Sequence, residues 1–531
     1  MCAMPVARGD PHRPPRRRVS GRLSLALLAA GYAALIAAWL VANPFGRAPD
    51  EPAHYVRALA AGTGDVHGQR VSLPGYSPAT RKWVEGIGRE FSLPPRLVLA
   101  PNPCPVFDPK VPASCQRSWP ATGPPGPVFS NVGSYQPYIY APVGALMNLA
   151  PTPWAAFLIG RAVMATVSLA LIALAALTLW QPHSRGGLPL HPALVLGLVA
   201  AVSPMEIFLA GSLNPSGVEI AAGLATAAGL LSLAARHAPR GAWLTFGAGA
   251  TVLALTRSLG PYFVAVLVGI GVLAFGGRLL QAAREAPEAA VVAAGCVVGA
   301  AVLNLWWEAA YQPHLSWAGV FGHLTLSQVP ELSQEVVGKF GWLEAHLPWP
   351  FYVAWGVVFA TLVVFALARG TWIERAALFG LLAGCAALAV AFHSVMPETI
   401  GFDFQGRYLM PLVVAAPLLA GEILRRRRIS LRSLSIWAAT AGLVAAVLQF
   451  LGWYLNARRY AVGTSGPEWF VSRAAWVPPG GWILWIAVAV AGSLCIATGS
   501  VLVAAPRLAF GGAVEGRART PSPRADTAIA A

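Results

Sequence analysis

Long apolar runs that carry almost no charge dominate this chain. Examples are residues 162–179 and 220–235, and short polar connectors separate one run from the next. Lipid offers no water to pair backbone N–H and C=O groups, so a spanning segment must be a helix or part of a closed barrel. A helix needs about 20 apolar residues to cross the hydrocarbon core of a bilayer. These runs therefore predict an all-α polytopic integral membrane protein.

The charge content agrees with this interpretation. Charged residues make up only 11% of the 531 positions, whereas a typical soluble domain carries about 25%. The pattern predicts about 12 transmembrane helices. We expect them at 22–42, 154–180, 191–211, 216–235, 242–258, 261–277, 288–308, 350–368, 374–395, 408–424, 433–455 and 481–504.

The basic residues indicate an orientation. The formal net charge is +16, but the arginines sit in short loops between apolar runs and not on one face, so we predict contact with a lipid bilayer and no nucleic acid. With the basic loops inside, the leader 1–21 and the tail 506–531 are both expected in the cytoplasm, and the composition of the tail is typical of disorder. The other basic connectors expected inside contain Arg185, Arg236, Arg240, Arg278, Arg284, Arg369, Arg375, 425–428 and Arg432.

Three long segments of the membrane domain 22–505 are then expected outside the cytoplasm. They span about 43–137, 309–349 and 456–480. The first is rich in proline and glycine, which favours a cap built from loops with a helix or two over an independent domain. Residues 138–150 are a candidate for a further short or re-entrant helix.

Two cysteines share the first of these loops. Cys104 and Cys115 are separated by ten residues and lie in a compartment expected to be oxidising, so we predict a disulfide between them. No adjacent His or Cys completes a metal site with this pair.

A cluster of ionisable residues directly follows the first predicted span. Asp50 is a candidate N-cap and Gly62 a candidate stop, which predicts a short helix over about 51–61. His54 lies three residues after Glu51 and four after Asp50, so one helix face is expected to carry two carboxylates and an imidazole. Such a cluster is suited to deprotonating a hydroxyl, to binding a cation, or to both. The alternative is structural, with Asp50 capping the helix and Glu51 complementing its dipole.

Charged residues inside the predicted spans gather on one side of the membrane. Ionisable groups in a bilayer are costly and normally face a cavity or one another. Salt bridges between helix ends would explain one or two pairs, whereas a larger set indicates a water-filled pocket that opens outward. The residues expected at outer helix ends are Arg161, Glu206, Glu219, Arg257, Glu308 and Arg407.

Three further motifs lie near the same surface. Asn214 belongs to a tight turn at 212–217, where an Asn-Pro helix start is as good an interpretation as ligand contact. Lys339 and Trp342 belong to a Gly-Lys-Phe-Gly-Trp stretch whose aromatic density suggests a surface that contacts sugar or lipid. Arg407 and Tyr408 lead into a span from outside, where an arginine is well placed to hold a phosphate.

Motifs for other chemistries are absent from the sequence. There is no Gly-x-x-x-x-Gly-Lys-Ser/Thr loop, no His-Glu-x-x-His, no nucleophile elbow and no pair of Cys-x-x-Cys sites. This disfavours ATP hydrolysis and zinc proteolysis.

Four of these motifs, taken in order, resemble the bacterial membrane proteins of domain-of-unknown-function family 2142. They are Pro-Asp-Glu-x-x-His at 49–54, Ser-x-Asn at 212–214, Phe-Gly-Trp-Leu at 340–343 and Gln-Gly-Arg-Tyr at 405–408. The resemblance covers roughly residues 22–505 and implies a multi-pass protein of the bacterial cytoplasmic (inner) membrane. That family is similar in turn to the GT-C glycosyltransferases, which take sugar from a polyprenyl-phosphate carrier outside the membrane. This last step is an analogy between folds.

The resemblance implies roles for the candidate residues. Asp50 or Glu51 would serve as general base or as ligand of a divalent cation, and the sequence leaves this choice open. A phosphate-bearing donor would be neutralised by arginines at the outer surface. The candidates for contact with phosphate or substrate are His54, Arg57, Arg161, Arg257, Arg407, Tyr408, Asn214, Lys339 and Trp342.

The expected function is transfer of a sugar from a polyprenyl-phosphate carrier to a cell-envelope glycan or lipid-linked acceptor. A nucleotide-sugar donor would need a cytoplasmic site, and no cytoplasmic loop is long enough to build one. Two alternatives stay open: a transporter or flippase of lipid-linked saccharides, and a noncatalytic protein of envelope assembly. A transporter would favour ionisable groups near the midplane and broken helices in related halves.

Overall fold

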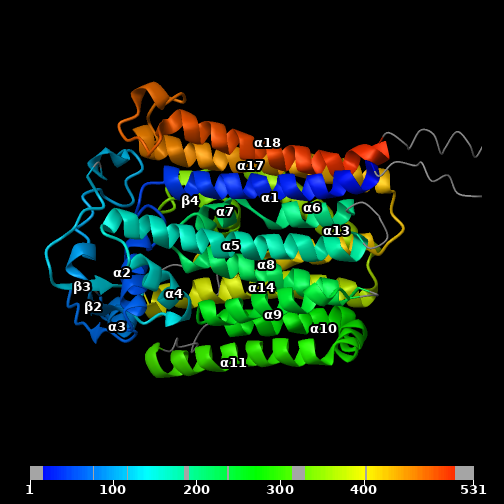
Figure 1. The fold of residues 1–531 in the computed structure, drawn as a ribbon, viewed down its shortest axis with the longest axis horizontal. Helices are drawn as coiled ribbons and strands as arrows, with labels where there is room; N and C mark the ends of the chain where they lie inside the picture. The colour runs from blue at the N-terminus through cyan, green and yellow to red at the C-terminus, as the bar shows by residue number, and fades with distance from the viewer. Residues whose placement is uncertain are drawn as a thin grey trace, which may run out of the picture.

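Long helices run side by side in the computed structural model and form one bundle (Figure 1). The structure describes residues 16–75, 77–116, 118–184, 191–235, 238–313, 329–400 and 404–508. The predicted leader before residue 16, the tail after residue 508, and the connector residues Arg185 and Arg236 lie outside the described residues.

The bundle confirms a polytopic helical membrane protein. Within the described ranges, ten segments are long and apolar enough to cross a membrane, and a bent helix pair makes an eleventh. One shorter apolar helix adds a twelfth segment, and the number of segments then equals the 12 expected from sequence. The helices are α1 (Arg16–Ala42), α5 (Pro153–Ser184), α6 (Pro192–Ala201), α7 (Pro204–Ala210), α8 (Pro215–Leu233), α9 (Arg240–Thr256), α10 (Gly260–Glu285), α11 (Pro287–Tyr311), α13 (Trp349–Arg369), α14 (Trp372–Ile400), η4 (Gly406–Leu409), α15 (Met410–Val413), α16 (Ala415–Arg425), α17 (Leu431–Val462) and α18 (Gly481–Leu508).

Two segments differ from simple spans. The run predicted at 191–211 is broken between α6 and α7, which meet at 63°, because Val202 leaves the helical conformation and Ser203 caps a new helix that begins at Pro204. Helix α9 stops at Thr256 because Arg257 adopts an extended backbone. The chain then turns at once into α10, and this turn places the Arg257 side chain at the end of the bundle.

One end of the bundle carries a cap. The N-terminal end of α1 and the C-terminal end of α18 lie at the opposite end (Figure 1). The ends of the described chain therefore share a side, as an even number of crossings requires. The basic-loop pattern predicts that this side is the cytoplasm.

The cap is built mainly from the first loop. It contains three helices and a small antiparallel sheet in the order β1-β2-β3, in which Gln69 pairs with Glu90 and Arg89 with Ser130. The sequence did not reveal these short strands. Helix α4 is the extra helix suspected at 138–150. The elements are α2 (Glu51–Gly62), β1 (Gln69–Arg70), α3 (Pro78–Ile87), β2 (Arg89–Ser92), η1 (Pro95–Leu97), η2 (Ala113–Gln116), β3 (Pro127–Ser130) and α4 (Pro137–Met147).

Helices α2 and α4 cross with almost no space between them. A Cβ atom on Gly144 would lie 1.6 Å from the backbone oxygen of Ala58, so only glycine fits there. This contact fixes α2, and with it the residues just before its first turn, against the membrane bundle.

The other two loops predicted outside the cytoplasm complete the cap end. In the second loop, residues 314–328 lie outside the described residues, and the remainder forms a helix followed by a two-stranded antiparallel sheet. The elements are α12 (Val329–Val337), β4 (Lys339–Phe340), β5 (Ala345–His346) and, in the third loop, η5 (Val471–Arg473).

Helix α8 is the centre of the bundle. All of its residues are buried, and it packs against α5, α9, α10, α15 and α16. Its first turn, at Asn214 and Pro215, lies next to the cap residue Pro49. The carbonyl oxygen of Pro49 accepts a 2.9 Å hydrogen bond from the side-chain amide of Asn214. A fully buried helix thus supports the segment that carries Asp50.

Candidate active site

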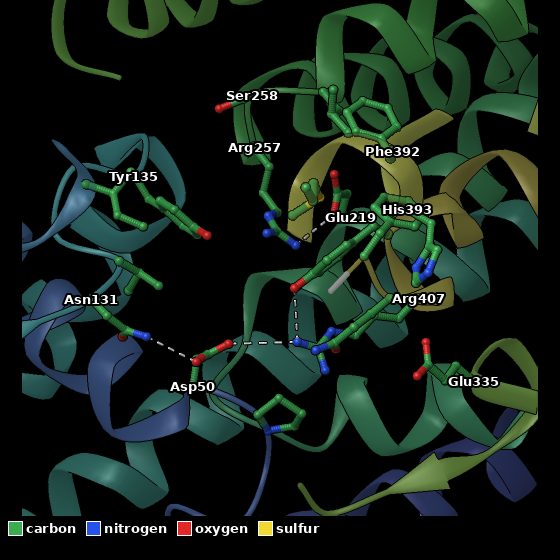
Figure 2. A pocket seen from close by; sticks show the side chains of 18 of the residues that line it. Asp50, Asn131, Tyr135, Glu219, Arg257, Ser258, Glu335, Phe392, His393 and Arg407 are labelled. Carbon is green, nitrogen blue, oxygen red and sulfur yellow. Dashed lines mark hydrogen bonds and ion pairs between the residues drawn. The ribbon is translucent and has the colours of Figure 1, made fainter. Parts of the chain in front are cut away.

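A cavity of about 1280 Å³ lies where the cap meets the spans. Its centre is polar and contains side chains from the cap, α8, the α9–α10 turn and η4 (Figure 2). One flank is apolar and comes from α10 and α14. The lining residues used below are Asp50, Phe107, Asn131, Tyr135, Glu219, Arg257, Leu259, Phe263, Val266, Glu308, Glu331, Glu335, Trp342, Leu343, Leu388, Phe392, Met396, Arg407 and Tyr408.

Backbone strain is concentrated around this cavity. In the described part of the chain, the non-glycine residues with positive φ are Asp50 (58°), Phe107 (59°) and Leu343 (63°). All three line the cavity. Each such residue costs on the order of 1–3 kcal/mol and persists where the surrounding structure enforces it, most often at functional sites. The cavity is therefore the candidate active site.

Asp50 points into the cavity and does not cap its helix. It occupies the predicted N-cap position of α2, but its side chain makes no capping hydrogen bond because its backbone is left-handed. Instead, one carboxylate oxygen accepts a 3.3 Å hydrogen bond from Asn131, and the other lies 3.8 Å from a guanidinium nitrogen of Arg407. The side chain is 30% exposed, so an incoming hydroxyl group has access to it.

Arg407 faces Asp50 from η4 (Figure 2). Its side chain is only 3% exposed, and within the described ranges its Nε and Nη1 atoms have no hydrogen-bond partner. A buried donor left without an acceptor costs roughly 1–3 kcal/mol, and more when it is charged. An anion that entered the cavity would supply the acceptors that this guanidinium lacks.

A second arginine lies beside the first. Arg257 donates a 3.1 Å hydrogen bond to Ser216 and lies 3.9 Å from the Glu219 carboxylate. Its guanidinium also lies over the ring of Tyr408, 4.8 Å from the centroid, while Arg407 contacts the same ring at 5.1 Å. Both guanidinium groups therefore contact the Tyr408 ring, which helps to hold them at the cavity centre.

The apolar flank belongs to the membrane spans. Leu259 directly precedes α10, Phe263 and Val266 come from its start, and Leu388 and Phe392 come from α14. A ligand that fills this cavity meets Arg257 and Arg407, together with the carboxylates of Asp50 and Glu219, at the centre and a hydrocarbon-like surface on this flank.

Glu51 points away from the cavity although it follows Asp50 directly. Its two oxygens accept 2.6 and 2.7 Å hydrogen bonds from Arg161, and the backbone N–H groups of Gly46 and Leu213 donate two more at 2.7 and 2.9 Å. Arg161 in turn donates to the carbonyls of Leu40, Asn43 and Pro44. Both side chains are fully buried. The pair joins the end of α1 to α5 and α2, and neither side chain lines the cavity.

His54 and Arg57 serve the packing of α2. The His54 Nδ1 atom lies 2.8 Å from the Tyr140 hydroxyl. Arg57 is fully buried and donates to the carbonyls of Tyr135 and Val66, and burial lowers its pKa to about 10. Neither residue lines the cavity, so the predicted cluster of two carboxylates and an imidazole does not form one site.

Protonation of His54 is predicted to be linked to stability. Burial, together with the positive Arg257 and Arg407, lowers the pKa of His54 well below its ordinary value of 6.5. The unfolded chain therefore takes up a proton near pH 6.5 while the folded chain does not, and stability is lost as pH falls. Between pH 6.5 and 5 we expect a loss of up to about 2 kcal/mol from this residue. Thermal unfolding of wild type and His54→Gln should show a shallower pH slope in the variant, and equal slopes would contradict this account.

The remaining predicted residues divide between the cavity and its supports. Trp342 lines the cavity, and its indole N–H donates to the Gly46 carbonyl at 3.1 Å. Asn214 caps α8 and accepts a hydrogen bond from the Ser216 N–H. Lys339 is buried and forms an ion pair with Glu331.

Of the charged residues predicted at outer helix ends, Glu219, Arg257, Glu308 and Arg407 line the cavity, whereas Arg161 and Glu206 do not.

Glu335 is a cavity residue that the sequence interpretation missed. It is 4% exposed, and one of its oxygens accepts a 2.6 Å hydrogen bond from the Gly406 N–H. Burial raises the pKa of this carboxyl, while the Gly406 N–H opposes the shift. Glu335 thereby holds the segment that positions Arg407. A signal was present, because Glu331 and Glu335 lie four residues apart on one face of α12, just before the Gly-Lys-Phe-Gly-Trp stretch.

The residues present do not form a protein-only metal site. Among the described side chains, no group of three or more His, Cys, Asp and Glu residues converges closely enough to hold a metal ion. Asp50 and Glu51, the pair suggested as metal ligands, diverge, and both Glu51 oxygens already accept hydrogen bonds from Arg161.

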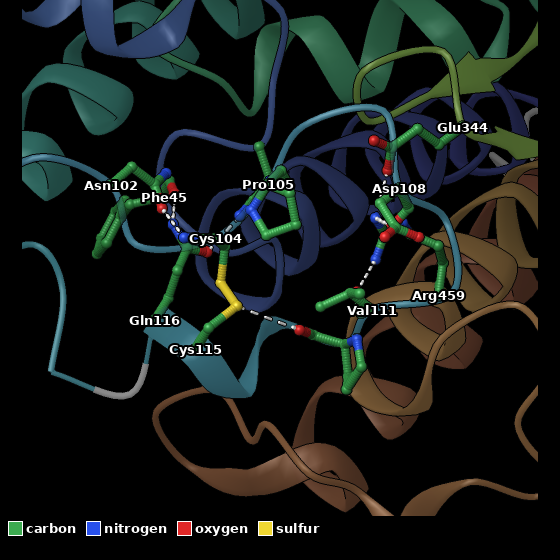
Figure 3. Close-up of a disulfide and its surroundings, with 12 residues drawn as sticks. Phe45, Asn102, Cys104, Pro105, Asp108, Val111, Cys115, Gln116, Glu344 and Arg459 are labelled. Carbon is green, nitrogen blue, oxygen red and sulfur yellow. Dashed lines mark hydrogen bonds and ion pairs between the residues drawn. A yellow bond between two sulfur atoms is a disulfide. The ribbon is translucent and has the colours of Figure 1, made fainter.

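The predicted disulfide is present. Cys104 and Cys115 are bonded, with their Cα atoms 5.4 Å apart (Figure 3). The bond closes a loop of the cap whose tip, at Val106 and Phe107, lines the cavity.

Comparison with known proteins supports the family and little else. The family described as predicted membrane protein (DUF2142) matches residues 34–416, well over half of the chain. Among curated proteins, none is significantly similar. The crystal structure of ArnT from Cupriavidus metallidurans in the apo state is similar to this chain, with a TM-score of 0.37 and 17% sequence identity. The match covers 70% of this chain and 67% of that chain. The structure of the same protein bound to undecaprenyl phosphate is 15% identical, with coverage of 81% and 77% and a TM-score of 0.35.

Scores this low do not carry the ligand of those structures over to this chain. The family match does not depend on them, and its range includes Asp50, Asn214, Trp342 and Arg407. These residues belong to the four motifs on which the sequence resemblance was based. The chain therefore belongs to the DUF2142 family of predicted membrane proteins.

Proposed function

We propose that this protein is a GT-C-type glycosyltransferase that moves a sugar from a polyprenyl-phosphate carrier to a cell-envelope glycan or lipid-linked acceptor outside the cytoplasm. One observation carries the proposal. The cavity places the incompletely paired Arg407 guanidinium beside the Asp50 carboxylate, at the end of an apolar flank made by two membrane spans. Phosphate, hydroxyl and isoprenoid chain each have a complementary surface there.

The donor would be held by its phosphate. The guanidinium groups of Arg407 and Arg257 both contact the Tyr408 ring and supply positive charge from side chains that are only 3% and 20% exposed. The isoprenoid chain would extend along Leu259, along Phe263 and Val266 of α10, and along Leu388 and Phe392 of α14. A charged head and a long apolar tail then occupy the polar and apolar parts of one cavity.

The acceptor would be activated by Asp50. Its carboxylate takes the proton of the acceptor hydroxyl as that oxygen forms a bond to the anomeric carbon of the donor sugar. The bond between the anomeric carbon and the phosphate oxygen breaks, and the electron pair leaves with the polyprenyl phosphate. Arg407 stabilises the negative charge that gathers on this leaving group.

The proposal predicts that Arg407 controls binding of the lipid phosphate. Replacing Arg407 by alanine is expected to weaken binding of undecaprenyl phosphate to the protein in nanodiscs by about 100-fold, because removing one partner of a buried charge interaction costs roughly 2–5 kcal/mol. The matched control is Arg473→Ala, which removes an exposed arginine at the cap end. Its binding should equal that of wild type. Equal binding by wild type and Arg407→Ala would refute the phosphate role of the cavity.

Transport of a lipid-linked saccharide is the second candidate, and one observation favours it. The bent pair α6–α7 carries Glu206, which is fully buried and whose two oxygens have no hydrogen-bond partner among the described residues. Broken spans with buried ionisable groups are common in transporters. However, Glu206 does not line the cavity, so this feature is separate from the site that fits the phosphate.

A further inference from the structure

A rigid aromatic surface forms the edge of the cavity on the cap side. Phe107 lines the cavity, yet its side chain is 67% exposed. Its ring meets the edge of Trp342, with centroids 5.7 Å apart and planes at 72°. Leu343, the next residue in the second loop, lines the cavity as well. We call Phe107, Trp342 and Leu343 the aromatic edge.

The loop that presents Phe107 is held at several points. The Cys104–Cys115 disulfide closes it (Figure 3). Arg459 of α17 donates 2.7 Å hydrogen bonds to the carbonyls of Val111 and Asp108, and it is itself paired with the buried Glu344 at 2.5 Å. On the other side, Arg47 donates to the carbonyl of Pro105 at 2.8 Å. The loop therefore resists collapse of Phe107 onto the protein.

The conformation of the aromatic edge favours a ligand over simple packing. Phe107 and Leu343 both have left-handed backbones, which cost free energy that the surrounding contacts must offset. In spite of this cost, the Phe107 ring stays mostly in solvent. A preorganised, exposed aromatic ring reduces the conformational entropy that the protein has to lose when a ligand binds. Exposure alone is common for apolar residues, but exposure combined with strain and anchoring at a cavity is not explained by packing.

The position of the edge distinguishes sugar from lipid tail. The apolar flank for a lipid chain is formed by α10 and α14, whereas the aromatic edge is built only from the two outside loops. A pyranose ring has an apolar face of C–H groups, whose hydrogens suit the electron-rich face of an aromatic ring, and a rim of hydroxyls. Polar groups suited to the hydroxyls, Asp50 and Glu331, line the same cavity. The polar groups match the hydroxyl rim of a sugar ring and do not match a hydrocarbon chain.

We propose that Phe107 and Trp342 form a subsite that binds a pyranose ring of the acceptor glycan and presents its hydroxyl to Asp50. The assignment of this ring to the acceptor rests on the proposed function. The sugar-binding property itself is independent of the lipid phosphate, because Arg407 lies at the cavity centre and is not part of the aromatic edge.

Saturation-transfer NMR tests this subsite directly. The probes are the methyl pyranosides of glucose, galactose, mannose and rhamnose, added one at a time to the full-length protein in nanodiscs, with farnesyl phosphate as the lipid-tail probe. We expect saturation of the ring C–H protons of at least one glycoside by wild type, a loss of at least five-fold in Phe107→Ala, and recovery in Phe107→Tyr. The matched control is Trp469→Ala, which removes a 58% exposed aromatic residue outside the cavity and should leave the signal unchanged.

Three outcomes would overturn the inference. The first is that wild type gives no glycoside signal. The second is that Phe107→Ala gives the same glycoside signal as wild type. The third is that Phe107→Ala loses the farnesyl phosphate signal and keeps the glycoside signal. The Arg407→Ala variant separates this test from the proposed function. This variant should keep the glycoside signal. If it also kept full binding of undecaprenyl phosphate, the proposed donor site would be refuted while the sugar subsite would still be supported.

Discussion

Replacing Asp50 by asparagine is expected to lower sugar transfer by about 10²–10⁴-fold, the range that a positioned general base contributes. The expectation follows from the position of Asp50, the exposed carboxylate that faces Arg407 at the cavity centre. Asparagine has a similar shape and, like aspartate, tolerates a left-handed backbone, so thermal stability and binding of undecaprenyl phosphate should stay close to wild type. Turnover measured at saturating donor would show the effect.

The matched control for this variant is Asp65→Asn. Asp65 is another cap carboxylate, it accepts a hydrogen bond from the Gly68 N–H, and it does not line the cavity. Asparagine keeps that acceptor, so transfer should be unchanged. Asp50→Asn turning over at the wild-type rate would remove Asp50 as the base and leave Glu335 as the next carboxylate to test.

Replacing Glu51 by glutamine is expected to destabilise the protein by roughly 3–5 kcal/mol, because it leaves the Arg161 guanidinium buried without its counter-charge. The variant also weakens the hydrogen bonds from the Gly46 and Leu213 N–H groups. Thermal unfolding in detergent would measure the loss. Any fall in transfer should follow the fraction of folded protein.

The control is Glu468→Gln. Glu468 pairs with Arg458 at 3.2 Å but is 82% exposed, and an ion pair in such a position contributes little to stability. Its unfolding temperature should match wild type. If Glu51→Gln were as stable as wild type yet inactive, the catalytic role would belong to Glu51, and the structural role inferred from its contacts would be wrong.

The spans could be predicted from sequence because a bilayer imposes a simple rule. Each crossing needs a long apolar helix, and each of the 12 predicted segments corresponds to one helix or to a run of two or three consecutive helical elements. The break between α6 and α7 was not foreseen, although Ser203 followed by Pro204 is a helix-start signal inside an apolar run. The strands of the cap were missed because β1 has only two residues and the others four, too few for a periodic pattern.

The candidate site was only partly predictable. Sequence spacing placed Asp50, Glu51 and His54 on one helix face, but this prediction requires the backbone of Asp50 to be helical. The left-handed backbone of Asp50 turns its side chain toward Arg407, whereas Glu51 turns toward Arg161. The arginine that pairs with each carboxylate lies more than one hundred residues away, and no local pattern reports such a contact. The cluster of outer-end charges did predict a cavity, because those charges must face water or one another.

The most direct test of the central claim is transfer of a radiolabelled sugar from polyprenyl phosphate to envelope glycan acceptors by the purified, reconstituted wild-type protein. A mixed set of labelled donors would be used, and the movement of labelled lipid between leaflets would be followed in the same vesicles. We predict label in the glycan fraction with wild type and only background with Asp50→Asn. Movement of labelled lipid between leaflets with no label in any glycan would contradict the transferase function and support transport of the lipid-linked saccharide.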